Sequence, residues 1–285
     1  MTRADDIPAP HPFITQPPHD VAGWVAAFDA REIPVLAATD DAVAELALNE
    51  DAVDAHLLAD TMVLDPLMTL KLLRHVAAMR RGRDQSDPET ATEALVMLGI
   101  TPFFRTFATQ PTVEQGLAGQ DEALAGLRLV LARAHRAAQF SLGFAVHRSD
   151  HDAALLHEAA LLHDFAEMLL WVHAPALALA LMQRQQADPH LRSADAQRAL
   201  LNVELGDLQQ ALMKTWGLPG LLVQISDNHA SPLAQVRNVQ LAIRLARHSA
   251  RGWDNAALPD DIDEIANLLH LGLTPTLNLL HDLRD

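Results

Sequence analysis

The chain has 285 residues, of which 49% are apolar and 20% charged, and its formal net charge is −16 at pH 7. This charge excludes general attraction to a nucleic-acid backbone. The absence of cysteine excludes disulfides, thiolate metal sites and cysteine nucleophiles. No apolar run reaches the ~18 residues that span a bilayer, and residues 1–20 lack the apolar segment of a signal peptide. We therefore expect a cytoplasmic protein that binds neither nucleic acid nor membrane.

The sequence predicts an all-α fold. Alanine and leucine dominate, tyrosine is absent and β-branched residues are sparse, which favours helix over strand. Residues 1–20 are rich in proline and are predicted to form an extended arm. After them, apolar residues recur at helical spacing between prolines and glycines. The predicted helices cover 21–31, a segment from a cap at 39–41 to 48, 53–63, 67–79, 88–98, 103–109, 121–146, 152–172, 175–186, 193–216, 221–229 and 233–251, with two more opened by Pro259 and Thr274-Pro275.

The segment Gln110–Gly119 has turn character and is the predicted boundary between two helical lobes. The extended arm 1–20 is then followed by an N-terminal lobe, 21–110, and by a second helical bundle, 120–285. We find no fixed-period repeat.

The pair His163-Asp164 is the strongest functional signal in the chain. On a predicted helix, these adjacent side chains can both reach one metal ion. His135 lies 28 positions upstream on a separate predicted helix and can complete a set of ligands on one side of that ion. This pattern is typical of the metal centre of a phosphohydrolase.

Other polar clusters carry less information. His147 and His151 have the i,i+4 spacing of some zinc helices, but a predicted helix cap at Ser149-Asp150 separates them. The pair His157-Glu158 lacks the second histidine of a His-Glu-x-x-His site. We interpret both as cap or solvated residues, and Trp216 as a core residue at a helix end.

Five short motifs fall in the order found in one bacterial family. They are Asp65-Pro66 with Leu72-Leu73-Arg74, then Ala94–Gly99, Leu161–Asp164, Trp216–Pro219 and Asn228-His229. Over residues 30 to 235, this order resembles that of HDOD domains, signalling modules related to the HD phosphohydrolases. The resemblance implies an all-α, two-lobed helical bundle whose C-terminal lobe is HD-domain-like.

The sequence departs from the active HD enzymes at several positions. Those enzymes carry a Gly-Lys pair just after the His-Asp pair, where this chain has Ala166 and Glu167. Ile243 stands where we place their last aspartate ligand, and Leu205 where many HDOD domains keep a histidine. A histidine pair is reduced to Asn228-His229. The candidate metal ligands that remain are His135, His163, Asp164 and His229, an incomplete set that we interpret as vestigial.

Three interpretations of the His163-Asp164 pair follow. It can belong to a working metal-dependent hydrolase, bind a divalent metal weakly without turnover, or form a satisfied polar pair inside the bundle. Hydrolysis of a phosphoester needs positive charge near the developing negative oxygens, and Glu167 supplies the opposite charge. We favour the polar pair, with His163, His135 and backbone N–H groups as the donors to Asp164.

The expected function is therefore that of a non-enzymatic HDOD-type regulatory module in bacterial signal transduction, acting through contacts with signalling proteins. No cofactor is expected beyond a weakly bound divalent metal, and the chain can form a homo-oligomer. The alternative is a metal-dependent phosphohydrolase acting on a nucleotide or a cyclic dinucleotide.

Overall fold

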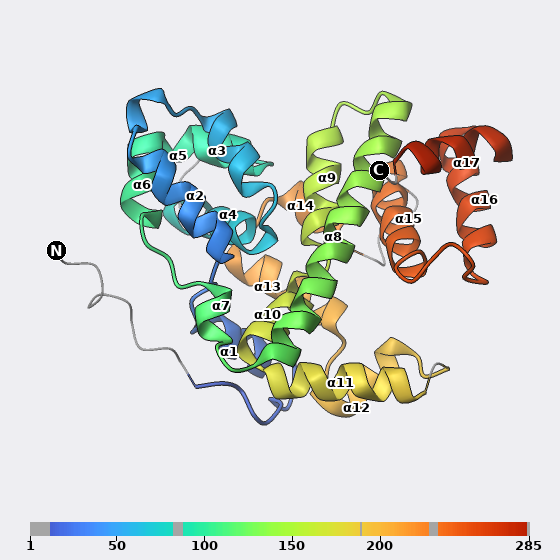
Figure 1. Cartoon of the computed structure of the whole chain (residues 1–285), viewed down its shortest axis with the longest axis horizontal. Helices are drawn as coiled ribbons and strands as arrows, with labels where there is room; N and C mark the ends of the chain where they lie inside the picture. The colour runs from blue at the N-terminus through green and yellow to red at the C-terminus, as the bar shows by residue number, and fades with distance from the viewer. Residues whose placement is uncertain (1–11, 82–87, 189, 228–232, 284–285) are drawn as a thin grey trace. The chain divides into compact units, whose positions relative to one another are not determined.

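The computed structural model describes residues 12–81, 88–188, 190–227 and 233–283, and these residues form α-helices joined by short turns (Figure 1). Within these ranges the only β-type pairing is an isolated parallel bridge between Val35 and Thr112, so the predicted all-α class is correct. The α-helices are α1 Val21–Asp29, α2 Ala37–Ala47, α3 Ala55–Met62, α4 Pro66–Arg80, α5 Ala91–Leu98, α6 Ile100–Phe107, α7 Val113–Gly116, α8 Asp121–Arg148, α9 Ala153–Leu162, α10 Phe165–His173, α11 Pro175–Ala187, α12 Ser193–Leu201, α13 Leu205–Trp216, α14 Gly220–Ile225, α15 Ala234–His248, α16 Leu258–Leu269 and α17 Leu273–Asp282, with a 3-10 turn, η1, at Glu50–Ala52.

Several helix ends follow from the local sequence. Asp65 caps α4 by accepting from the backbone N–H groups of Leu67 and Met68 at 2.9 and 3.1 Å, and Pro66 fills the first helical position. Gly217 ends α13 in the left-handed conformation, at φ 68°, which glycine adopts without the steric cost of a side chain. The end at Gly217 was predicted, whereas the start of α4 was expected one position later, at Leu67, with Asp65-Pro66 ending the helix before it.

Two other predicted starts were wrong. The helix expected from Thr39–Asp41 begins at Ala37, and its N-cap residue Leu36 makes no side-chain capping bond. The helix expected near Pro88 begins at Ala91, because Thr90 caps it by accepting from the backbone N–H of Glu93. At α5 several residues with capping side chains follow one another, and the sequence pattern did not distinguish them. At α2 the first N–H groups donate to distant carboxylates, Leu36 to Asp65 and Ala37 to Glu114, which local sequence does not reveal.

Two predicted long helices are each broken. The segment 152–172 divides into α9 and α10, and the residues between them are His163 and Asp164. The segment 193–216 divides into α12 and α13, where Asn202 turns the chain in the left-handed conformation at φ 63°. Helical periodicity continues through both breaks, since one turn between two helices can preserve the same buried face. The pair His163-Asp164 therefore lies at a helix junction and not on a helix.

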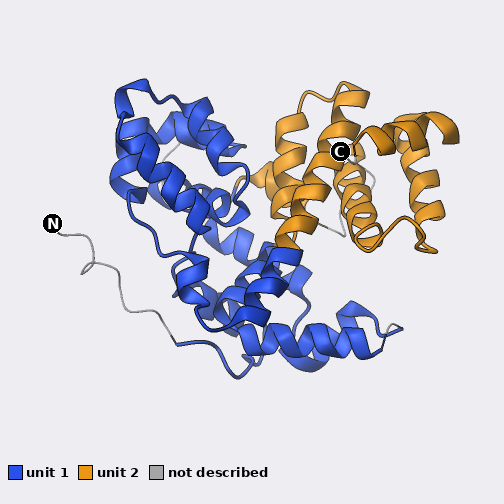
Figure 2. Ribbon diagram, in the orientation of Figure 1, with its two compact units in different colours: residues 1–129, 165–218 blue, residues 130–164, 219–285 orange. Residues whose placement is uncertain are grey.

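The described chain divides into two compact units (Figure 2). Unit 1 contains residues 1–129 and 165–218, and unit 2 contains residues 130–164 and 219–285. The helix α8 begins in unit 1 and ends in unit 2. The lobes predicted from the sequence divide the chain once, near Gln110–Gly119, and differ from these units; that division stays a prediction.

Unit 1 has a polar anchor around Trp216. Its indole Nε1 donates to Asp29 Oδ1 at 3.0 Å, and Arg74 Nη2 donates to the same oxygen at 2.9 Å. The guanidinium of Arg74 also lies over the indole ring, 4.6 Å from its centre. The ring of Phe165 stacks on the indole of Trp216, with ring centres 5.8 Å apart. Trp216 is thus a core residue at a helix end, as predicted.

Two glycines of α8 allow close packing. A Cβ atom on Gly126 would lie 2.3 Å from the indole of Trp171 within unit 1. A Cβ atom on Gly143 would lie 2.4 Å from a methyl group of Leu283 within unit 2. The hydrogen atom of glycine leaves room for these side chains, so each of the two glycines marks a packing contact of α8.

Unit 2 is joined by buried hydrogen bonds between α8, α9 and α15. Ser141 Oγ lies 3.0 Å from the carbonyl oxygen of Leu156 and 2.9 Å from Asn238 Oδ1, and Asn238 Nδ2 donates to the carbonyl of Ser141 at 3.2 Å. These bonds satisfy polar groups that the apolar core would otherwise leave unpaired.

In the ranges described, no single helix is both long and apolar enough to cross a membrane. One pair of segments, Ala153–His173 and Pro175–Ala187, meets the length and composition test only when it is taken together across its bend.

Candidate functional site

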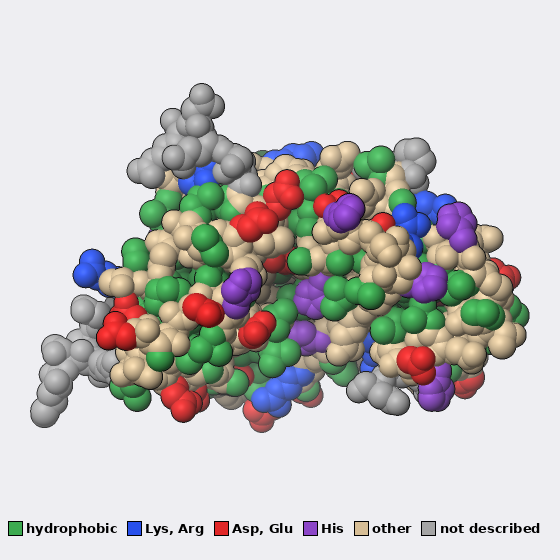
Figure 3. Space-filling view, turned by 90° about the horizontal axis from the view of Figure 1, so that it is seen from above, with side chains coloured by type: hydrophobic (Ala, Val, Ile, Leu, Met, Phe, Trp, Pro, Cys, Tyr) green, Lys and Arg blue, Asp and Glu red, His purple; other side chains and the backbone are tan. Residues whose placement is uncertain are grey.

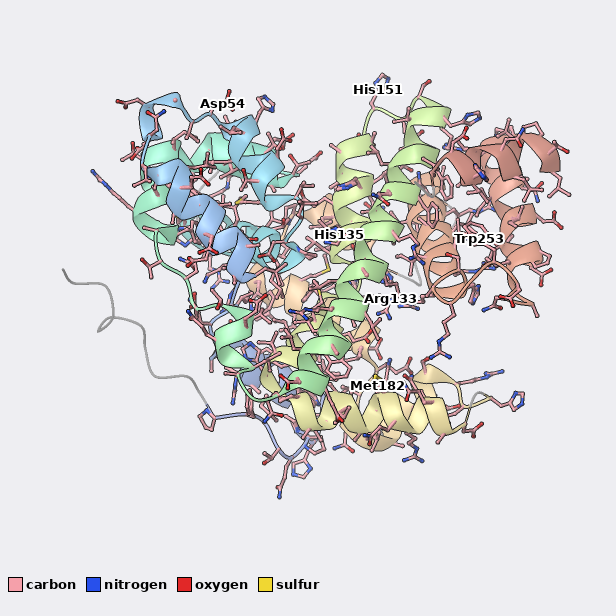
Figure 4. The ribbon with its side chains drawn as sticks, in the orientation of Figure 1. Asp54, Arg133, His135, His151, Met182 and Trp253 are labelled. Carbon is pink, nitrogen blue, oxygen red and sulfur yellow. The ribbon has the colours of Figure 1, made fainter. Side chains whose placement is uncertain are left out.

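The candidate site is built within unit 2, around the carboxylate of Asp164. The turn after α9 places His163 and Asp164, α8 supplies Arg133, and α15 supplies Arg247. Figure 4 labels Arg133 and His135, which lie two positions apart on α8. Side chains at this spacing leave a helix in nearly opposite directions.

Both oxygens of the Asp164 carboxylate accept from cationic or imidazole groups. Arg133 donates to Oδ2 through Nε at 2.9 Å and through Nη2 at 2.8 Å. Arg247 Nη2 donates to Oδ1 at 2.7 Å, and His163 Nδ1 lies 3.1 Å from the same oxygen. An ionised carboxylate can only accept, so His163 Nδ1 carries the proton in this contact.

The environment keeps Asp164 ionised. The side chain is 10% exposed, and burial by itself raises the pKa of a carboxyl group. The charges of Arg247 and Arg133 and the hydrogen bond from His163 act against burial and hold the pKa of Asp164 well below its usual range. The carboxylate is therefore negative at every physiological pH, and two guanidinium groups balance it.

This arrangement does not fit a divalent metal on Asp164. A metal needs three or more nitrogen or oxygen ligands, yet no group of three or more His, Asp or Glu side chains in the described ranges could hold an ion. The two oxygens that would bind a cation already face the positive charges of Arg133 and Arg247. A further double charge there would be repelled at close range.

The four predicted ligands meet only in part. His163 and Asp164 are in contact, whereas His229 falls outside the described residues. The pair His157-Glu158 was expected to be cap or solvated residues, but it lies inside α9 and Glu158 is buried. Burial, and after it the charge of the nearby His135, lower the pKa of His157. The convergence of His135 with His163 and Asp164 stays a prediction. Among the hydrogen-bond donors that the sequence predicted for Asp164, the structure shows His163.

The arginines at Asp164 were missed by sequence reasoning. Arg247 follows Ile243 by four positions, one helical turn along α15. Ile243 is buried and occupies the position where the resemblance to HD enzymes places an aspartate. An expected aspartate replaced by Ile243, with Arg247 one helical turn later, is a pattern that could have indicated a basic side chain at this site. Arg133 is one of three arginines in the predicted helix 121–146, and the sequence does not distinguish it from Arg128 and Arg136.

Comparisons with known proteins agree with this architecture. Residues 33–232 match the family model described as the HDOD domain. The chain belongs to the HDOD family. No curated protein matches it.

Two solved structures share the fold at low sequence identity. The MmoQ response regulator from Methylococcus capsulatus str. Bath is 19% identical, with a TM-score of 0.66 over 89% of this chain and 98% of that one. A virulence factor from Campylobacter jejuni subsp. jejuni is 16% identical, with a TM-score of 0.62 over 88% of this chain and 89% of that one. At this identity the comparison describes the fold alone.

Membership of the HDOD family gives the quoted motifs a physical meaning. Leu72-Leu73-Arg74 and Trp216–Pro219 are distant in sequence, but Arg74 and Trp216 meet at Asp29. Asp65 caps α4, and its Oδ2 also accepts from the backbone N–H of Leu36 at 2.7 Å. These HDOD motifs therefore mark structural anchors of unit 1.

Proposed function

We propose that this HDOD chain is a regulatory module that catalyses no reaction and acts in signal transduction through contacts with other proteins. The observation that carries the proposal is that Arg133 and Arg247 both form ion pairs with the carboxylate of Asp164. In place of a metal ion with two positive charges, two guanidinium groups hold the carboxylate at the helix junction.

Local charge supports the absence of phosphoester hydrolysis. Glu167 stands in the first turn of α10, three positions after Asp164. A carboxylate near a phosphate raises the energy of a transition state that gains negative charge. The description of the related MmoQ structure as a response regulator is in keeping with a role in signalling.

The test is an assay for hydrolysis combined with metal analysis. Purified full-length protein is incubated with Mn²⁺, Mg²⁺ or Fe²⁺ and offered bis-p-nitrophenyl phosphate, nucleoside monophosphates and cyclic dinucleotides. We expect no turnover above the buffer and less than one equivalent of metal after gel filtration.

The alternative, a metal-dependent phosphohydrolase, makes the opposite prediction. Turnover that disappears in Asp164→Ala and survives in an Asp263→Ala control would overturn the proposed function. Asp263 is an exposed acid of α16, so its removal changes the net charge equally without touching the site.

A further inference from the structure

The helices α2 and α3 in unit 1 present an unusual surface, which we call the α2–α3 face. Along α2, Asp41, Glu45 and Leu48 are exposed at a spacing of four and three residues. Side chains at that spacing lie on one side of a helix. The face therefore begins with two acids followed by a leucine.

The same pattern continues in α3. Leu57 and Leu64 are seven positions apart, and Val63, between α3 and Leu64, retains helical backbone angles, so the two leucines share one side. Leu48, Leu57 and Leu64 are 86%, 42% and 67% exposed. The exposed acids Asp54 and Asp60 stand beside them. Because α2 packs against α3, the two stripes belong to one region of unit 1.

The helices α2 and α3 themselves carry no lysine or arginine. Between Arg31 and Lys71 the sequence contains no lysine or arginine, and Lys71 itself is buried. In the described ranges none of the exposed acids of the face forms an ion pair. Figure 3 shows acidic side chains among hydrophobic ones on the left part of the molecule, which contains α2 and α3 together with α5 and α6, with one basic side chain at its left edge.

We propose that the α2–α3 face is a docking surface for a protein segment that carries lysine or arginine beside leucine-like side chains. This inference rests on the proposed function, to which it adds the chemistry of the partner. The acids of these two helices repel one another, and a basic partner relieves that repulsion while it covers the leucines. An amphipathic helix laid on such a surface matches apolar anchors seven positions apart.

Charge also argues against the other occupants. The acids repel the anionic headgroups of a bacterial-type membrane surface and the phosphates of nucleic acids. A second copy of this chain carries the same net charge of −16, so close approach through an acidic face is opposed. A cationic and apolar peptide meets neither obstacle.

The probe is a labelled peptide of about 14 residues in which leucine and lysine alternate at helical spacing, offered to the full-length protein. A peptide with glutamate in place of lysine serves as the negative probe. Fluorescence anisotropy measures both affinities at low and high salt. We expect saturable binding of the lysine peptide alone, weakened by salt because exposed charges contribute.

Two pairs of variants locate the binding. Leu57→Ser with Leu64→Ser, and separately Asp41→Lys with Asp60→Lys, should each weaken the affinity by about tenfold or more. The matched controls are Leu273→Ser with Leu277→Ser on α17, and Asp260→Lys with Asp263→Lys on α16. These controls remove equally exposed residues in unit 2 and should change the affinity by less than about twofold. Because the leucine variants and the charge variants are independent, loss of fold in one pair, seen by circular dichroism, leaves the other pair to decide.

Several results would overturn the inference. Equal weakening by the α16 variants would show general attraction of a cation to an acidic chain. Binding to vesicles of anionic phospholipid that is lost in Leu57→Ser with Leu64→Ser would assign the face to membranes, and a dimer lost in the same variant would assign it to a second copy. None of these results involves metal or turnover, so this inference and the proposed function can fail separately.

Discussion

Replacing Asp164 by alanine should destabilise unit 2 because it removes the acceptor of four donor contacts. Arg133 supplies two of them from a side chain that is 21% exposed, whereas Arg247 is 47% exposed and can turn toward water. The cost therefore comes mainly from Arg133 and from His163, which is 10% exposed. Breaking one partner of a buried ion pair costs about 3–5 kcal/mol.

We expect a smaller loss for Asp164→Ala, about 2–4 kcal/mol, because Arg133 retains some access to solvent. Asp164→Asn keeps the volume and one acceptor oxygen and should lose about half as much. The exposed Asp263→Ala serves as the control and should change stability by less than about 0.5 kcal/mol.

The assay is urea unfolding in the presence of chelator, so that metal binding contributes nothing. Since two units can unfold separately, hydrogen exchange measured by mass spectrometry should accompany it. Faster exchange is expected in α8 after residue 129, in α9 and in α15, and unchanged exchange in α1 and α4. A metal-free Asp164→Ala protein as stable as the metal-free wild type would refute the reasoning and favour a metal ligand.

Three further predictions follow from contacts described above. Burial and the nearby imidazole of His135 lower the pKa of His157. Neutral His157 therefore stabilises the fold above about pH 6.5, and this stability is lost as the pH falls through the lowered pKa. His157→Gln should make the melting temperature depend less on pH between about pH 7 and 5. Gly126→Ala should cost about 1–3 kcal/mol in thermal unfolding because the facing indole is rigid, whereas Gly143→Ala, which faces a flexible leucine, should be close to neutral; equal losses would contradict the packing argument. Trp216→Phe removes an indole N–H donor to Asp29 and should cost about 1–2 kcal/mol by urea unfolding, and no loss would show that this bond is not stabilising.

The sequence predicted most helices because their apolar residues recur at one spacing, but that spacing says little about where a helix breaks. The residues 152–172 kept a helical pattern although the chain turns at His163 and Asp164. Asn202 could have been recognised as a turn, since asparagine tolerates the left-handed conformation found there.

The candidate site was predicted less completely than the fold. His163 and Asp164 are adjacent in sequence and their contact needed no long-range knowledge. Arg133 and Arg247 approach Asp164 from two other helices, 31 and 83 positions away. Such partners depend on how α8 and α15 pack, which single-sequence patterns do not specify. The motifs pointed to His163 and Asp164, and the favoured interpretation as a hydrogen-bonded polar pair lacked the two arginines that join it.

The way the chain passes between its two units has a consequence for the order of folding during synthesis. Unit 1 needs residues up to Leu218, and unit 2 needs residues after Pro219. Residues 130–164 are therefore made before α15, against which α9 packs. A nascent chain folds as its residues emerge, so Asp164 can pair with Arg133 before Arg247 has been synthesised. Until then the apolar sides of α8 and α9 lack their cover, and this is the stage at which a nascent chain of this protein would need a chaperone most.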